Sequence, residues 1–145
     1  MYKKILVALD HTAGDEVLLR EIVPLARLLQ AELLCVHVAD GWVARHYNEL
    51  KLAESEEMRE DRAYLEKITG QLCGQGVTCT HRLAMGDPPK EILRVAETEG
   101  CDLIAMTTHG HRLIGDIIYG ATIEKVRHSA NVPLFIVTAK QLAKE

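Results

Sequence analysis

The polar residues best suited to binding or chemistry gather in one segment, which runs Thr-Thr-His-Gly-His-Arg from Thr107 to Arg112. Two imidazoles, a guanidinium and the open backbone of a glycine are groups that suit an anionic ligand. The segment Gly120-Ala-Thr122 follows, and we expect it to open a helix whose unpaired amides and aligned dipoles favour negative charge. Together the two segments favour an anion-binding site, with a flexible connection that ends in a glycine cap as the alternative.

Two common phosphate-binding motifs are incomplete in this chain. Gly110 and Gly115 have the spacing of the first half of a P-loop, but Asp116-Ile117 stands where lysine and a hydroxyl residue are required. The G-x-G-x-x-G fingerprint of dinucleotide-binding enzymes is missing from the turn after the first predicted strand. The sequence therefore argues against a P-loop NTPase and against a NAD-dependent Rossmann enzyme.

The histidines of the loop, His109 and His111, leave two minor alternatives open. The H-x-G-H signature of nucleotidylyl transferases stabilises a phosphoryl-transfer transition state, but it follows a first strand and has different spacing. A metal bound by the two imidazoles would find no cysteine or carboxylate at ligand spacing in the same loop. No nucleophile elbow, Ser-His-Asp order or H-E-x-x-H motif occurs. We therefore expect neither catalytic residues nor metal ligands.

The elements that position this loop are strands alternating with helices. Five apolar segments are predicted as strands: Ile5–Leu9, Leu33–Val38, Val77–Leu83, Leu103–Met106 and Leu134–Val137. The first is apolar without alternation, which indicates a central strand covered on both faces. We expect one α/β domain over residues 1–145, with a doubly wound five-stranded parallel sheet and helices on both faces. Ligands bind such sheets beyond the carboxyl ends of the strands, where the strand order reverses.

Three helix boundaries are predicted from capping and charge. Thr12 and Asp15 have the spacing of a capping box that opens the first helix. Nine of the fourteen residues of Glu49–Arg62 are charged, and we interpret this run as the solvated first half of one long helix. The last helix is expected over Gly120–Ala130, which leaves residues 107–119 as a loop.

Composition excludes several classes of protein. The chain has 17 basic and 21 acidic residues, and this net charge of −4 gives no electrostatic footprint for nucleic-acid binding. Its apolar runs fall well short of the roughly 20 residues of a membrane span, and Met1–Lys4 leads directly into a strand rather than a signal peptide. The cysteines at positions 35, 73, 79 and 101 show no C-x-x-C spacing and are most simply core residues. We expect a cytoplasmic protein without nucleic-acid or membrane partners.

Several segments together resemble the universal stress protein family, and the resemblance covers the whole chain. In the carboxyl third these are Asp102–Gly110, the nine-residue spacer His111–Tyr119, Gly120-Ala-Thr122 and Asn131–Val137. Nearer the amino terminus, Lys4–Asp10, Leu34–Val38 and the turn Gly86-Asp-Pro88 have the family's order and spacing.

This resemblance implies the strand order 3-2-1-4-5, a homodimer and an ATP site with the signature G-x-x-G, nine residues, then G-[S/T]. Gly110 and Gly120 are kept at the right spacing, whereas Thr107 replaces the first glycine and Ala121 replaces the hydroxyl residue. Thr107 restricts the approach of backbone to ligand. Ala121 removes one hydrogen bond, worth about 0.5–1.5 kcal/mol net, for which the neighbouring Thr122 could compensate.

The resemblance also assigns residues to the nucleotide. Asp10 would accept a hydrogen bond from adenine, although capping of the following helix is an alternative role. The residues implied around the base are Ala8, Leu9, Asp10 and Val38. Those implied along the rest of the nucleotide are Met106, Thr107, Thr108, His109, Gly110, His111, Arg112, Gly120, Ala121 and Thr122.

The resulting expectation is a regulatory protein of the stress response that binds ATP, or ADP or AMP, with Mg²⁺. Its homodimer would form through residues 132–137, because an apolar edge strand is otherwise exposed to aggregation. One alternative is a nucleotide-free dimeric interaction module on the same fold. Another is a slow ATP hydrolase, against which the lack of a positioned base or phosphate lysine argues.

Overall fold

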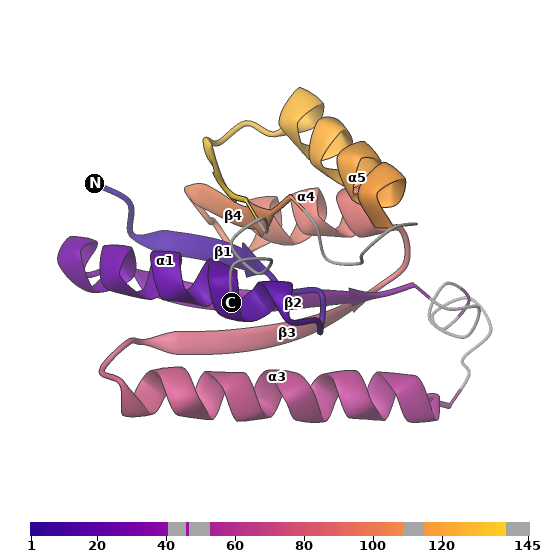
Figure 1. The fold of residues 1–145 in the computed structure, drawn as a ribbon, viewed down its shortest axis with the longest axis horizontal. Coiled ribbons are helices and arrows are strands. Elements are labelled where there is room, and N and C mark those ends of the chain that lie inside the picture. The colour runs from indigo at the N-terminus through magenta and orange to yellow at the C-terminus, as the bar shows by residue number, and fades with distance from the viewer. Residues whose placement is uncertain (41–45, 47–52, 109–114, 139–145) are drawn as a thin grey trace.

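The strands form a single parallel sheet. A computed structural model of the protein describes residues 1–40, 46, 53–108 and 115–138, with only the backbone given for 115–120 (Figure 1). The strands are β1 (Lys4–Ala8), β2 (Glu32–Ala39), β3 (Cys79–Met85), β4 (Leu103–Thr107) and β5 (Leu134–Val137). Their order is β3-β2-β1-β4-β5 and all four pairings are parallel. This confirms the predicted fold class, with strand ends shifted by one or two residues.

β1 is central, as its unbroken apolar sequence predicts. Leu6 is in register with Leu34 of β2 on one side and with Ile104 of β4 on the other. The side chains of Ile5, Leu6 and Val7 are fully buried. A strand buried on both faces needs no polar alternation, because helices cover both of its surfaces.

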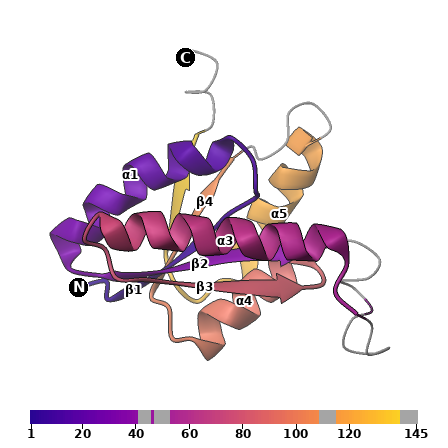
Figure 2. The same ribbon diagram turned by 90° about the horizontal axis from the view of Figure 1, so that it is seen from below.

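Two helices cover each face of the sheet. Helices α1 (Gly14–Leu29) and α3 (Glu56–Gly74) lie on one face, where Leu18 and Leu65 pack in one core cluster with Val7 (Figure 2). Helices α4 (Pro88–Thr98) and α5 (Gly115–Ser129) lie on the other, where Val95 and Val126 pack against Leu6 and its neighbours. Within the described ranges, no helix has both the length and the apolar character needed to cross a membrane.

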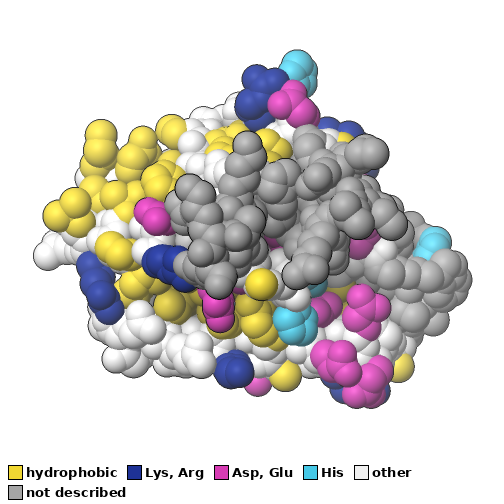
Figure 3. Space-filling model, viewed as in Figure 1, with side chains coloured by type: hydrophobic (Ala, Val, Ile, Leu, Met, Phe, Trp, Pro, Cys, Tyr) yellow, Lys and Arg dark blue, Asp and Glu magenta, His cyan; other side chains and the backbone are white. Residues whose placement is uncertain are grey.

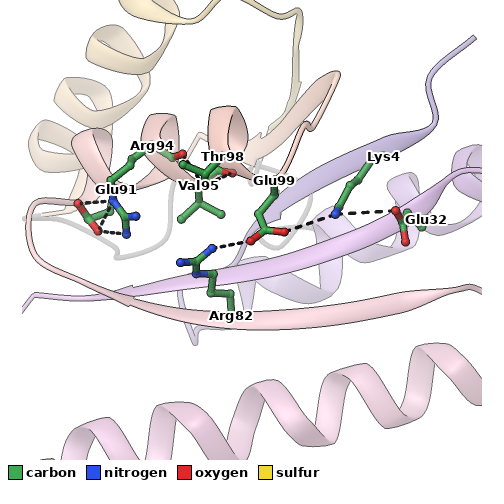
Figure 4. A network of polar contacts seen from close by, with 8 residues as sticks. All are labelled: Lys4, Glu32, Arg82, Glu91, Arg94, Val95, Thr98 and Glu99. Atoms are coloured by element: carbon green, nitrogen blue, oxygen red, sulfur yellow. Dashed lines mark hydrogen bonds and ion pairs between the residues drawn. The ribbon is translucent and has the colours of Figure 1, made fainter.

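A chain of ion pairs links the sheet to α4 (Figure 4). Glu99, directly after α4, lies 2.6 Å from Arg82 Nη1 of β3 and 3.6 Å from Lys4 Nζ of β1. Lys4 Nζ in turn lies 3.8 Å from Glu32 Oε1 of β2. Each pair is partly exposed and is worth at most about 1 kcal/mol, so burial in the two core clusters is the main stabilising contribution.

The first two predicted helix starts need correction. The amino-terminal cap of α1 is Ala13 rather than Thr12; Thr12 Oγ1 accepts from the amide of Gly14 at 3.3 Å, and Asp15 accepts from the amides of Asp10 and His11. Residues 53–55 are not helical, because Ser55 caps α3 by accepting from the amide of Met58 at 3.2 Å. The predicted start at Glu49 is therefore wrong over 53–55, and residues 47–52 lie outside the described residues.

The last helix begins earlier than predicted. α5 begins at Gly115, not at Gly120, so Gly120 is its sixth residue. Asp116 falls in the first turn, where the helix dipole favours an acidic residue, and an interior glycine costs only about 1 kcal/mol relative to alanine. Gly120 therefore does not mark the start of this helix.

Candidate functional site

A cavity of about 570 Å³ lies beyond the carboxyl ends of β1, β2 and β4. Its position is the point where the strand order reverses, with β2 on one side of β1 and β4 on the other. One wall is apolar and includes Val38, Ile92 and Met106. The other carries Asp10, His11 and His37, with side chains from the amino-terminal half of α3. The cavity thus combines apolar and polar lining residues, as small-molecule sites usually do.

Half of the residues predicted for the site line this cavity. They are Ala8, Leu9, Asp10, Val38, Met106, Thr107 and Thr122. Thr107 is buried, and its hydroxyl donates a 3.4 Å hydrogen bond to Oδ2 of Asp10. The threonine that replaces the first glycine of the family signature therefore joins the end of β4 to the end of β1.

The other predicted residues lie elsewhere or outside the described residues. Thr108 is half-buried, and its amide donates to the carbonyl of Val137 at 3.0 Å. Ala121 is exposed and does not line the cavity. The amide of Gly120, as the sixth residue of a helix, faces the carbonyl of residue 116 rather than a ligand. His109, Gly110, His111 and Arg112 lie outside the described residues.

Helix α3 brings acidic side chains to the cavity that the sequence analysis placed in solvent. Glu57, Glu60 and Asp61 line it, and Figure 3 shows acidic side chains gathered with a histidine on the right side of the visible face. Asp61 is only 5% exposed. It is spaced three residues after Met58 and four before Leu65, both buried, so helical periodicity places it on the buried stripe. That spacing was the signal that could have identified it.

Two histidines flank the buried carboxylate of Asp61. His11 Nδ1 donates to Oδ1 at 2.8 Å, and His37 Nε2 lies 3.3 Å from Oδ2. The second contact is electrostatic rather than an aligned hydrogen bond, and no described atom hydrogen-bonds to that oxygen. His37 Nδ1 donates to the carbonyl of Leu9 at 2.8 Å, which ties the cluster to the end of β1. Because Nδ1 of His11 is engaged, Nε2 is the nitrogen this ring can present to a ligand.

The backbone and the ring of His11 are both held in place. Its φ of 60° lies in the left-handed region, which is unfavourable for a residue with a Cβ. The Asp15 carboxylate compensates by accepting from the amide of His11 at 2.9 Å and from that of Asp10 at 2.8 Å. The imidazole stacks on Tyr64, with 4.0 Å between ring centroids and 18° between planes. These contacts preorganise the turn that carries Asp10 and His11.

Asp15 and Tyr64 have linked protonation states. Burial raises the pKa of Asp15, and hydrogen bonds from the Asp10 amide, the Tyr64 hydroxyl and the His11 amide offset only part of that effect. Burial, together with the nearby charge of Asp15, raises the pKa of Tyr64 well above its usual range. Tyr64 therefore keeps its proton and donates it to Asp15 Oδ2 at 2.7 Å.

The acidic wall and the apolar wall favour different parts of a ligand. Five carboxylates line the cavity: Asp10, Asp40, Glu57, Glu60 and Asp61. They repel phosphate and suit hydrogen-bond donors such as an exocyclic amino group or a sugar hydroxyl. Among the described residues, no group of three His, Cys, Asp or Glu side chains is arranged to hold a metal ion. The geometry fits an aromatic base whose donor edge faces the acids.

Comparisons with known proteins are consistent with this geometry. The model of the universal stress protein family matches residues 1–138. The chain is similar to universal stress protein MJ0577 of Methanocaldococcus jannaschii, at 29% identity over 97% of each sequence. The solved structure of MJ0577 superposes with a TM-score of 0.79 at 30% identity, covering 95% of this chain and 96% of that one.

Two more distant solved structures share the fold and carry nucleotides. One is a universal stress protein of Archaeoglobus fulgidus in complex with dAMP, with a TM-score of 0.69, 21% identity and coverage of 93% and 97%. The other is a universal stress protein in complex with cAMP, with a TM-score of 0.68, 16% identity and coverage of 94% and 97%.

Proposed function

Since the chain belongs to the universal stress protein family, we propose that it binds an adenine nucleotide in the cavity beyond β1, β2 and β4. The observation that carries the proposal is the position of Asp10, a hydrogen-bond acceptor opposite an apolar wall at the reversal of strand order. The dAMP and cAMP found in proteins of the same fold support an adenine nucleotide as the ligand class.

The charges of the cavity suggest the orientation of this ligand. Adenine would lie against Val38 and Met106, with its amino group toward Asp10. The phosphates would extend away from the acids of α3, past Thr122 and toward the amino end of α5 at Gly115. ATP, ADP and AMP share the base and ribose, and Mg²⁺ would accompany the longer phosphate chains.

We further propose that the protein is regulatory and acts as a cytoplasmic homodimer in the stress response. β5 is the last strand of the sheet, and Ile136 is 39% exposed on it. Pairing of residues 132–137 with a second copy would cover this apolar edge. The four free thiols suit a reducing compartment.

A nucleotide-free dimeric module on the same fold is the second candidate. The hydrogen bond from Thr107 to Asp10 favours it, because that bond occupies the acceptor that adenine needs. Ala121 is exposed and has no polar side-chain group that could replace the Asp10 acceptor.

Calorimetry with ATP, ADP and AMP, with and without Mg²⁺, separates the two candidates. Asp10→Ala is expected to weaken all three nucleotides alike, since it removes a contact to the shared base. Glu66→Ala, at an exposed site on α3 outside the cavity, is the matched control and should bind like the parent. If the parent gives no heat at millimolar nucleotide, the nucleotide-free module is the better account.

A further inference from the structure

Three of the four cysteines gather at one place, between the carboxyl end of α3 and the strands β2 and β3. The Sγ atoms of Cys35 and Cys79 are 3.5 Å apart. Cys73 Sγ lies 3.6 Å from the carbonyl oxygen of Cys79. Cys79 is the first residue of β3, so the cluster lies at the opposite end of that strand from the nucleotide cavity.

The three thiols differ in exposure and in acidity. Cys73 is exposed, whereas Cys79 and Cys35 are buried behind it. A hydrogen bond with Cys79 and burial raise the pKa of Cys35, so Cys35 keeps its proton. The same contact lowers the pKa of Cys79, because Cys35 can donate to the Cys79 sulfur once that sulfur is ionised. The cluster therefore places a reachable thiol beside a thiol that more readily becomes a nucleophilic thiolate.

We propose that Cys73 and Cys79 are a peroxide-responsive thiol pair that closes to a disulfide, with Cys35 positioning and activating Cys79. The Cys73 thiolate attacks hydrogen peroxide, the O–O bond breaks, and Cys73 becomes a sulfenic acid while hydroxide leaves. The Cys79 thiolate then attacks the Cys73 sulfur, an S–S bond forms and the S–O bond breaks, releasing a second hydroxide. The two thiol protons convert both hydroxides to water, so two thiols and one peroxide give one disulfide and two waters.

The connection between the two cysteines has room for this closure. Only residues 74–78 separate them, and a Cβ added at Gly74 or Gly76 would meet no atom within 4 Å. Gly76 has a φ of 83°, a conformation that glycine adopts without strain. The amides of Gln75 and Val77 donate to the carbonyl of Leu72 and hold the turn, so closure falls mainly to rotation of the exposed Cys73 side chain. The pairing does not depend on nucleotide binding, because none of the three thiols lines the cavity.

The test is stoichiometric hydrogen peroxide added to the reduced full-length protein, followed by peptide mapping under non-reducing conditions. We expect the loss of two hydrogens and a peptide that joins Cys73 to Cys79. Cys73→Ser and Cys79→Ser should each abolish the cross-link. Cys101→Ser should not, because burial raises the pKa of Cys101 to about 11 and Cys101 stays a thiol.

Substitutions at Cys35 test its positioning role. Cys35→Ala removes the donor to Cys79 and is expected to slow disulfide formation roughly tenfold, while Cys35→Ser keeps a donor and should restore most of the rate. Equal rates for the two variants would show that Cys35 does not activate Cys79. A disulfide between Cys35 and Cys79, a disulfide between two chains, or Cys73 accumulating only as sulfinic acid would each overturn the pair. Circular dichroism of each variant confirms that it is folded before oxidation.

Discussion

The hydroxyl of Thr107, at the end of β4, donates to Oδ2 of Asp10 beyond the end of β1, across a distance of 3.4 Å. The bond spans the point where the strand order reverses, so it crosses the floor of the proposed adenine pocket. Thr107 occupies the position of the first glycine in the family signature, so a side chain is present where the signature has none. In the proposed site, Thr107 would therefore compete with adenine for the same carboxylate.

Thr107→Ala is expected to tighten nucleotide binding. The variant removes the Thr107 hydroxyl from Asp10 Oδ2 and takes two heavy atoms from the cavity wall, and a gain of about 1 kcal/mol would raise affinity roughly fivefold. Calorimetry with AMP gives the cleanest comparison, because AMP has the shortest phosphate chain. Thr107→Ser keeps the hydroxyl and should bind like the parent. Weaker binding by Thr107→Ala would mean that the hydroxyl orients Asp10 for the ligand instead of competing with it.

The sheet was predictable because its strands are apolar without interruption. The unbroken apolar run Ile5-Leu6-Val7 indicates a strand that is buried on both faces. Such a strand lies at the centre of a parallel sheet, and its position determines where the loops converge. Asp10 follows β1 and Thr107 ends the neighbouring β4, so their proximity follows from topology. Local sequence predicted the central strand, whereas the strand order that brings these two residues together came from the family resemblance.

The other half of the cavity, which α3 lines, depends on tertiary contacts that local sequence patterns do not reveal. Asp61 stands in a run of charges, and composition alone predicts solvent exposure for such a run. Its burial follows from α3 packing its Met58 and Leu65 stripe onto the sheet, which carries Asp61 to the two histidines. Gly120 illustrates the opposite error, since glycine suggested a helix boundary where the helix continues. Propensity is a weak guide when neighbouring turns already favour helix.

Substitutions at Asp61 should separate hydrogen bonding from charge. Asp61→Ala leaves the His11 ring without its acceptor and opens space beside His37, so the free energy of unfolding is expected to fall by about 2–3 kcal/mol. Asp61→Asn can still accept from His11 Nδ1 through its amide oxygen but removes the negative charge beside His37 Nε2, so a loss of about 1 kcal/mol is expected. Urea denaturation at neutral pH measures both.

A neighbouring acid provides the control for Asp61. Glu60→Ala, at an exposed site one residue away, should change the free energy of unfolding by less than about 0.5 kcal/mol. Equal losses for Asp61→Ala and Asp61→Asn would indicate that the negative charge, not the pattern of hydrogen bonds, stabilises the two histidines.

The proposed dimer predicts that a charge on β5 dissociates the protein. Ile136→Glu would place two like charges near each other across a two-fold axis, so sedimentation at micromolar concentration should change from dimer to monomer. Leu28→Glu is a matched control, because Leu28 on α1 is an exposed apolar side chain at 80% but lies outside β5. A monomeric parent, or dissociation by the Leu28 variant alone, would contradict an interface at 132–137.

Asp15 predicts how stability depends on pH. Burial raises its folded pKa above the ordinary value of 3.8, so the folded state holds this proton more tightly than the unfolded state does. The resulting stability is fully present below about pH 3.8 and is lost as pH rises through the raised folded pKa. Asp15→Asn cannot titrate, and it replaces one of the two accepting oxygens by an amide nitrogen that only donates. We therefore expect the parent's stability advantage over Asp15→Asn to be largest in acid and to shrink as pH increases, becoming constant above the folded pKa.

Urea denaturation of both proteins across this range measures the difference, with Glu66→Gln as an exposed control whose curve should parallel the parent. An advantage that grows with pH would show that the hydrogen bonds to Asp15 outweigh the cost of burying its charge.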